Sequence, residues 1–127
     1  IWTGTPPTEF LHLYDVLQRA QHEQVKASIA GIPAEEIDRV GRALISQEGY
    51  GQYFIHRTGH GIGVEAHEDP YIVEGNSIPV ASGNVFSVEP GIYVPGKWGA
   101  RLEDIVAVTE YEPNSLNTAD HDLAVLS

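Results

Sequence analysis

The residues best suited to chemistry lie within 55–70, which reads Ile-His-Arg-Thr-Gly-His-Gly-Ile-Gly-Val-Glu-Ala-His-Glu-Asp-Pro. Three of the chain's six histidines fall inside this segment: His56, His60 and His67. Imidazole titrates near neutral pH and is the commonest metal ligand in proteins. Three glycines alternate with other residues here: Gly59, Gly61 and Gly63. Glycine lets the backbone approach an ion or a substrate closely, so the segment is the first candidate for a metal-binding or catalytic site.

The spacing of the three histidines leaves their arrangement open. His56 and His60 share a face if the chain is extended, because side chains alternate along a strand. His60 and His67 are seven residues apart, which places them on opposite faces of a straight strand. A bend or bulge near Gly61 or Gly63 would bring both to one side. A phosphate-binding loop is disfavoured, because no helix with Lys followed by Ser or Thr comes after the glycines.

Two carboxylates in the last third of the chain are candidate partners of these histidines. The segments 85–94 and 100–109 are expected to form an antiparallel hairpin around a loop at 95–99. If the loop is centred near Lys97, Glu89 lies across from Ile105, and Glu103 becomes its diagonal neighbour at about 7–8 Å. Two like charges at this range repel each other. A cation bound between them would make the arrangement favourable, because it attracts both carboxylates. The alternative is a pair of solvated carboxylates with Arg101 as their partner.

Two amphipathic helices are predicted to precede these segments. In 8–30 apolar residues recur at helical spacing: Phe10, Leu13, Tyr14, Leu17 and Ala20. A second helix is predicted over 34–47, with one apolar stripe: Ile37, Val40, Leu44 and Ile45. His12 and His22 are interpreted as surface residues of the first helix. Short strands are expected at 1–3 and 123–126. Helices followed by antiparallel strands predict an α+β fold.

Composition excludes several classes of protein. With 127 residues and a net charge of −11, the chain fits one small domain and lacks the clustered Lys and Arg that nucleic acids or anionic membranes require. No apolar run of about eighteen residues is present, so no membrane span is expected. The chain has no cysteine, which rules out disulfides and thiolate zinc sites and makes the cytosol the expected location. It also lacks methionine, and we interpret it as part of a longer protein.

Three motifs in this order resemble the signature of the pita-bread metallopeptidases. They are the histidine segment 56–70, Ser-Val-Glu-Pro-Gly-Ile-Tyr at 87–93 and Arg-Leu-Glu-Asp at 101–104. Within that family the chain is most similar to the Xaa-Pro dipeptidases (prolidases) and Xaa-Pro aminopeptidases. Methionine aminopeptidases share the first motif but usually lack the other two in this form. The resemblance covers 1–127 as a single domain, the carboxy-terminal portion of a pita-bread catalytic domain.

The resemblance implies a role for each motif residue. His60, Glu89 and Glu103 match metal ligands in enzymes that hold two divalent ions, commonly Mn, Co or Zn. His67 matches a catalytic histidine that contacts substrate and steadies the tetrahedral intermediate, and His56 one that lines the substrate pocket. Glu89 would carry a proton from the attacking water to the leaving proline nitrogen. These roles imply a proline-containing peptide as substrate.

Arg101 matches an arginine that braces the ligand shell and faces the substrate. Two further ligands of the family are aspartates that precede the matched region, and none of the chain's own aspartates matches them: Asp15, Asp38, Asp69 and Asp104 are among those considered. We therefore expect the chain to bind one ion weakly or none and to be inactive alone. Exposed sheet edges and apolar faces predict a homodimer or other self-association.

Two other functions remain open from the sequence. Some pita-bread domains have lost metal and bind proteins or peptides, although a binding module would not need His60, Glu89 and Glu103 together. A metal-free hydrolase of the same fold, such as a creatine amidinohydrolase, also tends to lack this full set. Two aspartates a short interval apart, just upstream, would favour the metallopeptidase.

Overall fold

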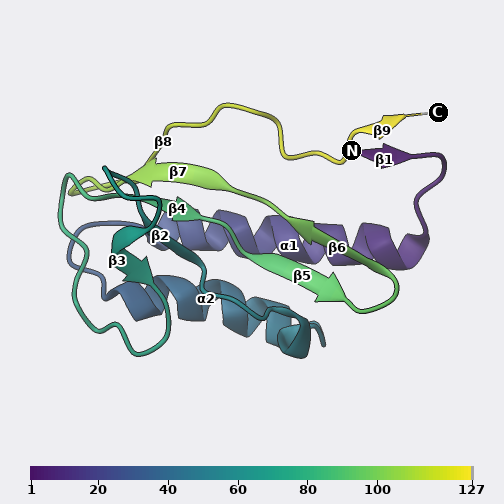
Figure 1. Cartoon of the computed structure of the whole chain (residues 1–127), viewed down its shortest axis with the longest axis horizontal. Coiled ribbons are helices and arrows are strands. Elements are labelled where there is room, and N and C mark those ends of the chain that lie inside the picture. Colours follow the sequence, from purple (N-terminus) through teal and green to yellow (C-terminus); the bar gives the residue numbers. More distant parts are fainter. Residues whose placement is uncertain (127) are drawn as a thin grey trace.

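The computed structural model of this chain describes residues 1–126 (Figure 1). Its helices are α1 (Thr8–Ala27), α2 (Ala34–Gln47) and a 3₁₀ turn, η1 (Gly51–Tyr53). Its strands are β1 (Trp2–Thr3), β2 (Gly59–Gly61), β3 (Glu68–Ile72), β4 (Val85–Val88), β5 (Gly91–Val94), β6 (Trp98–Arg101), β7 (Asp104–Ala107), β8 (Asn114–Ser115) and β9 (Val125–Leu126). The two long helices pack against each other, and α1 also contacts β4, β5 and β6. The architecture is the predicted α+β class.

The helices follow the apolar periodicity of the sequence. Helix α1 ends at Ala27, three residues before the predicted end, because Ser28 leaves helical geometry and its hydroxyl donates to the Gln24 carbonyl at 2.8 Å. Helix α2 has the predicted bounds. Val40, assigned to its apolar stripe, is instead 38% exposed. The predicted surface positions of His12 and His22 are confirmed.

The strands form one five-stranded sheet and two pairs. The sheet has the order β3-β2-β4-β7-β8, the second hairpin is β5-β6, and β1 pairs in parallel with β9, which joins the two ends of the described chain. The predicted strands at both chain ends are thus confirmed. Buried residues form two apolar clusters, one between α1 and the β5-β6 hairpin and one between the α2 start and the sheet.

The predicted long hairpin differs from the structure in two ways. Its first arm is broken at Glu89 and Pro90 into β4 and β5, and its second arm is split between Arg101 and Asp104. Its register was also wrong: Val88 pairs with Asp104, and Ser87, not Glu89, pairs with Ile105. The turn is centred on Gly96, which has a φ of 73°, rather than on Lys97. The same register carried through the break sets Glu89 opposite Glu103, so the two are not diagonal neighbours.

No helix within residues 1–126 is long and apolar enough to cross a membrane. The predicted cytosolic location stays a prediction.

The alternating glycines let β2 fit between its neighbours. A Cβ atom on Gly59 would lie 1.7 Å from the Ser87 carbonyl oxygen of β4. One on Gly61 would lie 2.1 Å from the carbonyl oxygen of Asp69 in β3. Backbone atoms on both sides leave no room for a side chain. The glycines therefore serve strand packing, whereas the sequence had been interpreted in terms of approach to an ion or substrate.

Replacing Gly59 by alanine is expected to destabilise the fold. The added methyl group overlaps a backbone oxygen that cannot move without separating β2 from β4, so we expect a loss of about 2 kcal/mol or more. Urea unfolding followed by circular dichroism measures this loss. Ser82→Ala, in an exposed turn, serves as control and should change stability by less than about 0.5 kcal/mol. Equal stability of Gly59→Ala and the wild type would contradict the packing argument.

Candidate metal and peptide site

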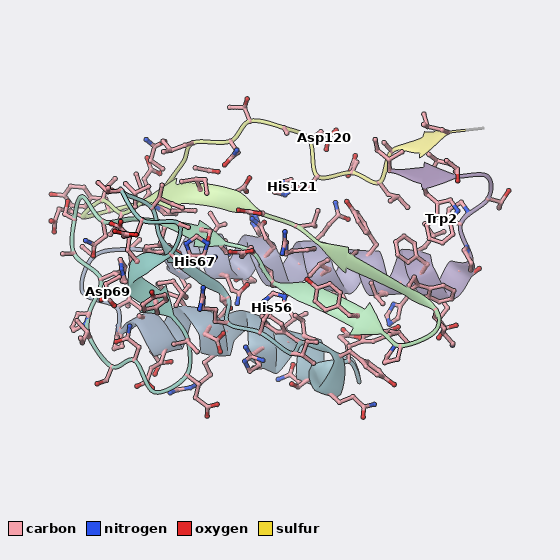
Figure 2. The ribbon with its side chains drawn as sticks, viewed as in Figure 1. Trp2, His56, His67, Asp69, Asp120 and His121 are labelled. Carbon is pink, nitrogen blue, oxygen red and sulfur yellow. The ribbon has the colours of Figure 1, made fainter. Side chains whose placement is uncertain are left out.

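A pocket of about 550 Å³ gathers most of the predicted site residues. Its lining comprises His56, Arg57, His60, His67, Tyr71, Val73, Glu89 and Arg101. Five of the six residues predicted to carry function are present, and Glu103 is absent from the lining. In Figure 2, His56 and His67 lie in the region of β2 and β5, away from both chain ends. The volume is in the range of pockets that hold small ligands.

His60 and Glu89 form the centre of this pocket. Nε2 of His60 lies 3.3 Å from Oε1 of Glu89, and the two side chains are only 13% and 14% exposed. Nδ1 of His60 lies 3.0 Å from the Gly61 carbonyl oxygen. Because a carbonyl can only accept, this contact places a ring hydrogen on Nδ1 and directs Nε2 toward the Glu89 carboxylate. A ring nitrogen and a carboxylate oxygen thus face each other, an arrangement that a shared cation or proton would stabilise.

Ser87 holds these two residues in place. Its hydroxyl accepts a hydrogen bond from the His60 backbone N–H at 3.1 Å and donates one to Oε1 of Glu89 at 2.9 Å. Ser87 is fully buried in β4. One hydroxyl therefore fixes the spacing between β2, which carries His60, and the break after β4, which carries Glu89. The sequence analysis had assigned no function to Ser87.

The arrangement of His60 and His67, which the spacing left open, includes an irregularity next to Gly61. The register of β2 against β3 shifts between Gly59 and Gly61. Beyond this irregularity the chain returns so that the rings of His60 and His67 meet edge to face, with centroids 4.4 Å apart. His67 is exposed, which leaves its ring accessible to a ligand in the pocket.

His56 is oriented by a residue that the sequence analysis missed. Nδ1 of His56 donates to the Arg57 carbonyl at 2.7 Å, and Nε2 shares a hydrogen bond with the Tyr93 hydroxyl at 2.9 Å. Tyr93 closes the Glu-Pro-Gly-Ile-Tyr motif on β5. Its place beside His56 depends on packing between segments 37 residues apart, which spacing alone does not reveal.

Arg101 and Glu103 occupy different positions relative to Glu89. Arg101 Nη1 lies 3.6 Å from Glu89 Oε2, and the Arg101 side chain is half exposed. Glu103 is exposed. Within residues 1–126 no three His, Asp or Glu side chains converge closely enough to hold a metal ion. Two donors, His60 and Glu89, fit a divalent ion by their chemistry and orientation.

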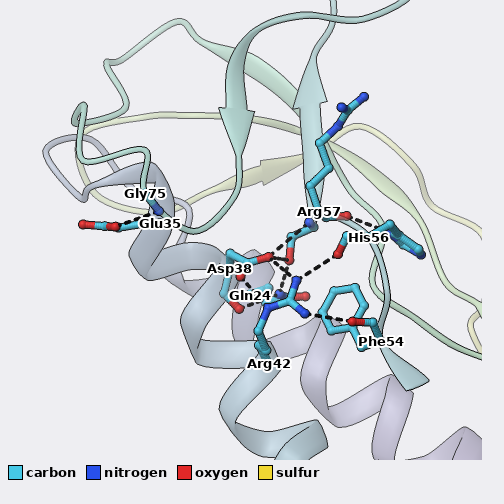
Figure 3. Close-up of polar contacts among 9 residues, drawn as sticks. Gln24, Glu35, Asp38, Arg42, Phe54, His56, Arg57 and Gly75 are labelled. Atoms are coloured by element: carbon cyan, nitrogen blue, oxygen red, sulfur yellow. Dashed lines mark hydrogen bonds and ion pairs between the residues drawn. The ribbon is translucent and has the colours of Figure 1, made fainter. Parts of the chain in front are cut away.

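A buried ion pair on α2 positions the segment that leads into the pocket (Figure 3). Asp38 is 1% exposed and receives hydrogen bonds from Arg42 at 2.7 and 2.9 Å. Arg42 also donates to the carbonyls of Phe54 at 2.9 Å and His56 at 2.8 Å. The hydrogen bonds to Asp38 raise the pKa of Arg42, which stays charged. The guanidinium therefore ties the His56 backbone to the helix.

The same carboxylate fixes the start of β2. Asp38 Oδ1 accepts from the Thr58 backbone N–H at 3.2 Å and from its hydroxyl at 2.8 Å. The Thr58 hydroxyl in turn accepts from Gln24 of α1 at 2.7 Å. The sequence signal was the Asp-Arg spacing of four residues on α2, which indicates an ion pair but not its partners in the loop.

Comparisons with known proteins agree with this fold and site. Residues 1–110 match the model of metallopeptidase family M24. A probable dipeptidase PepE from Mycobacterium bovis is 48% identical over 97% of this chain and 33% of its own length. An Xaa-Pro dipeptidase from Lactobacillus helveticus is 46% identical, again over 97% of this chain and 33% of its own length. The chain thus spans about one third of the length of these relatives.

Solved structures give the same result. The dipeptidase PepE from Mycobacterium ulcerans superposes with a TM-score of 0.94 at 49% identity, over 97% of this chain and 33% of that one. A recombinant prolidase from Thermococcus sibiricus also superposes with a TM-score of 0.94, at 46% identity, over 98% of this chain and 34% of the prolidase chain. The fold and motifs define a metallopeptidase of the pita-bread class. The chain belongs to metallopeptidase family M24.

Removing the Arg42 side chain is expected to destabilise the protein strongly. Arg42→Met leaves the buried Asp38 carboxylate without its counter-ion, which typically costs about 3 kcal/mol. Urea unfolding measures the effect. Arg39→Met on the same helix removes an exposed ion pair with Glu36 and should cost less than about 1 kcal/mol. Similar losses in both variants would contradict the role assigned to the buried pair.

Proposed function

We propose that a protein containing this chain hydrolyses Xaa-Pro peptide bonds in a metal-dependent reaction. The observation that supports this most is the pair formed by His60 and Glu89, whose Nε2 and Oε1 atoms face each other at 3.3 Å inside the pocket. Relatives described as a probable dipeptidase and an Xaa-Pro dipeptidase support the choice of bond. Because the chain spans about one third of their length, we propose that it forms the carboxy-terminal portion of the catalytic domain.

His60 and Glu89, with Glu103 opposite Glu89 across the strands, would supply one side of the metal shell. Divalent ions such as Mn, Co or Zn, when bound, would polarise the scissile carbonyl and lower the pKa of a water molecule. His60 suits this role because its Nδ1–H is already committed to the Gly61 carbonyl. Further metal ligands, such as two aspartates, would have to come from residues other than His60, Glu89 and Glu103.

The chain's other pocket residues are assigned the roles that the family resemblance implies, and their positions in the pocket support this assignment. Glu89 accepts a proton from the attacking water and delivers it to the leaving proline nitrogen. Ser87, which donates to Oε1 of Glu89, keeps that carboxylate oriented. His67, exposed beside His60, donates to the substrate carbonyl oxygen as negative charge develops there. His56 and Arg101 line the pocket and contact the peptide.

A second function is a peptide-binding module without catalysis. The observation that favours it is that, in the described part of the chain, no three potential metal ligands come together. The pocket and its cationic side chains would then serve recognition alone. Metal binding and turnover distinguish the two functions.

We also propose that the chain self-associates. Four large apolar residues between 55 and 78 are exposed: Ile55 at 75%, Ile62 at 42%, Val64 at 98% and Ile78 at 71%. Strands β3 and β8 are the edges of the five-stranded sheet and offer unpaired backbone groups.

Hydrolysis of an Xaa-Pro dipeptide should require Mn and more of the protein than this chain. We expect a longer protein that supplies two upstream aspartates to cleave the dipeptide, and the 127-residue chain to be inactive, as measured by release of free proline. Glu89→Gln in the longer protein should lower kcat by about 100-fold or more, because the proton carrier is lost. The exposed Glu65→Gln serves as control and should leave kcat unchanged.

Activity in the short chain would show that other residues complete the site. Metal binding by a folded, longer protein that never cleaves the dipeptide would favour the binding module.

Self-association should appear as a concentration-dependent mass in sedimentation equilibrium. Replacing the two most exposed apolar residues of the 55–78 region, in Ile55→Ser with Val64→Ser, should shift the chain toward the monomer because less apolar surface is buried on association. Leu116→Ser, a similar change in a distant exposed segment, controls for general hydrophobicity. A monomer at every concentration would contradict the proposal.

A further inference from the structure

A buried carboxylate lies directly after the break between β6 and β7. Burial alternates along 102–108, where the buried residues are Leu102, Asp104, Val106 and Val108 and the residues between them are more exposed. Three of these four are apolar, and Asp104 is the exception, at 7% exposure. A carboxylate in such a row is costly to remove from water, and an apolar side chain of similar volume often packs as well or better. Packing alone therefore does not explain Asp104.

Two side chains from distant parts of the sequence hold this carboxylate. Gln21 of α1 donates through Nε2 to Asp104 Oδ2 at 2.9 Å, in a contact that is buried from solvent. Nε2 of His121 lies 3.1 Å from Asp104 Oδ1, and because a carboxylate accepts, the ring donates. Each carboxylate oxygen thus has a partner of its own. These two bonds fix the direction of the Asp104 side chain as well as its burial.

His121 is itself held against α1. Its backbone carbonyl accepts hydrogen bonds from the Tyr14 hydroxyl and from Gln18 Nε2, each at 2.9 Å. Two residues further on, Leu123 packs against the apolar cluster between α1 and the β5-β6 hairpin. In Figure 2, His121 lies between the segment that follows β8 and the strands beneath it. His121 lies beyond residues 1–110, which match the family model, so the family motifs do not account for it.

The fixed carboxylate determines the side on which Glu103 lies. Leu102 packs in the apolar cluster with α1, and Asp104 bonds to Gln21 of the same helix. Neighbouring residues of an extended chain point to opposite faces, so Glu103, between these two, points away from α1. Its exposure agrees with this direction.

Glu89 lies on this same face. Val88 pairs with Asp104 in the β4–β7 register and packs in the second apolar cluster, so these two residues share the side that faces the helices. Glu89, one position beyond Val88, is turned to the other side, where it meets His60 at 3.3 Å. Glu89 and Glu103 are thus directed to one side of the sheet by the buried residue next to each of them.

We propose that Gln21 and His121 are positioning residues for the metal shell. By holding Asp104 on the helix side of the sheet, they direct Glu103 to the side where a metal ion would bind. This inference rests on the proposed function, in which Glu103 is a metal ligand. The segment that follows β8 thereby contributes to metal affinity, although none of its described residues lines the pocket.

Mn²⁺ affinity tests the proposal in a longer protein that supplies the two upstream aspartates. Electron paramagnetic resonance measures the free Mn²⁺ concentration and gives the dissociation constant without turnover. His121→Ala should weaken Mn²⁺ binding about tenfold, the lower end of the cost of losing an outer hydrogen bond that orients a metal shell. Gln21→Leu, which keeps a similar side-chain volume, should have an effect of the same size. His121→Gln retains an N–H donor and should bind Mn²⁺ within about twofold of the wild type.

Two controls separate positioning from a general loss of structure. His22→Ala removes an exposed histidine that lines the same surface hollow as His121, and within residues 1–126 His22 makes no hydrogen bond to Asp104. Val16→Ala leaves a cavity in the apolar cluster on α1 and lowers stability in urea, while the three side chains of the network stay in place. Both variants should bind Mn²⁺ as the wild type does, whatever their stability.

Other results would overturn the proposal. These are wild-type Mn²⁺ affinity in both His121→Ala and Gln21→Leu, an equal loss in His121→Gln and His121→Ala, or a loss in Val16→Ala as large as theirs. A longer protein that binds no Mn²⁺ would overturn the proposal together with the proposed function.

Otherwise the two fail separately. A longer protein that shows the expected pattern of Mn²⁺ affinities and never cleaves an Xaa-Pro dipeptide keeps the positioning network and loses the hydrolysis. Cleavage of the dipeptide, with the same Mn²⁺ affinity in every variant, keeps the hydrolysis and loses the network.

Discussion

The pocket depends on one buried ion pair. Taking Asp38 out of water is costly, and the cost is offset only because Arg42 and Thr58 together give its carboxylate four hydrogen bonds. Arg42 also donates hydrogen bonds to two backbone carbonyls of the loop that follows η1. The segment that carries the site histidines therefore has a fixed distance from α2. Within the described residues the backbone of 55–57 donates no hydrogen bond to another backbone group, so the Arg42 bonds and the buried Phe54 side chain hold this loop against α2.

From that fixed start, close backbone packing determines where the histidines point. Strand β2 lies between β3 and β4, and Gly59 and Gly61 allow contacts that any side chain would prevent. The tight fit brings Ser87 within reach of both His60 and Glu89. The segment 62–67 between the antiparallel strands β2 and β3 turns the chain back, so that His67 meets His60. A small hydroxyl and two glycines thus set the geometry of the most reactive side chains.

Local patterns predicted the two helices, the hairpin segments and the strands at the chain ends, whereas the short strands β2, β3 and β8 and the contacts between distant elements escaped prediction. Helical periodicity located α2 because the period is repeated over the whole element, and the motifs located the pocket residues. The hairpin register was wrong because the turn is defined by Gly96 alone, whereas Trp98 and Gly99 belong to β6. Moving the centre by one residue shifts each cross-strand partner by two. His56 contacts Tyr93 and Arg42. Both contacts depend on packing between distant segments, which no short-range spacing encodes.

The charge distribution explains how an acidic chain can hold a pocket lined by two arginines, Arg57 and Arg101. Each carboxylate near the pocket is already engaged: Glu89 with His60 and Arg101, and Asp38 with Arg42. Arg57 alone keeps an unshared charge within the described pocket. A divalent ion at His60 and Glu89 would need at least two more donors, since sites of this kind are usually four-coordinate or higher. The unshared charge of Arg57 and the His60–Glu89 pair are thus separate features of one pocket.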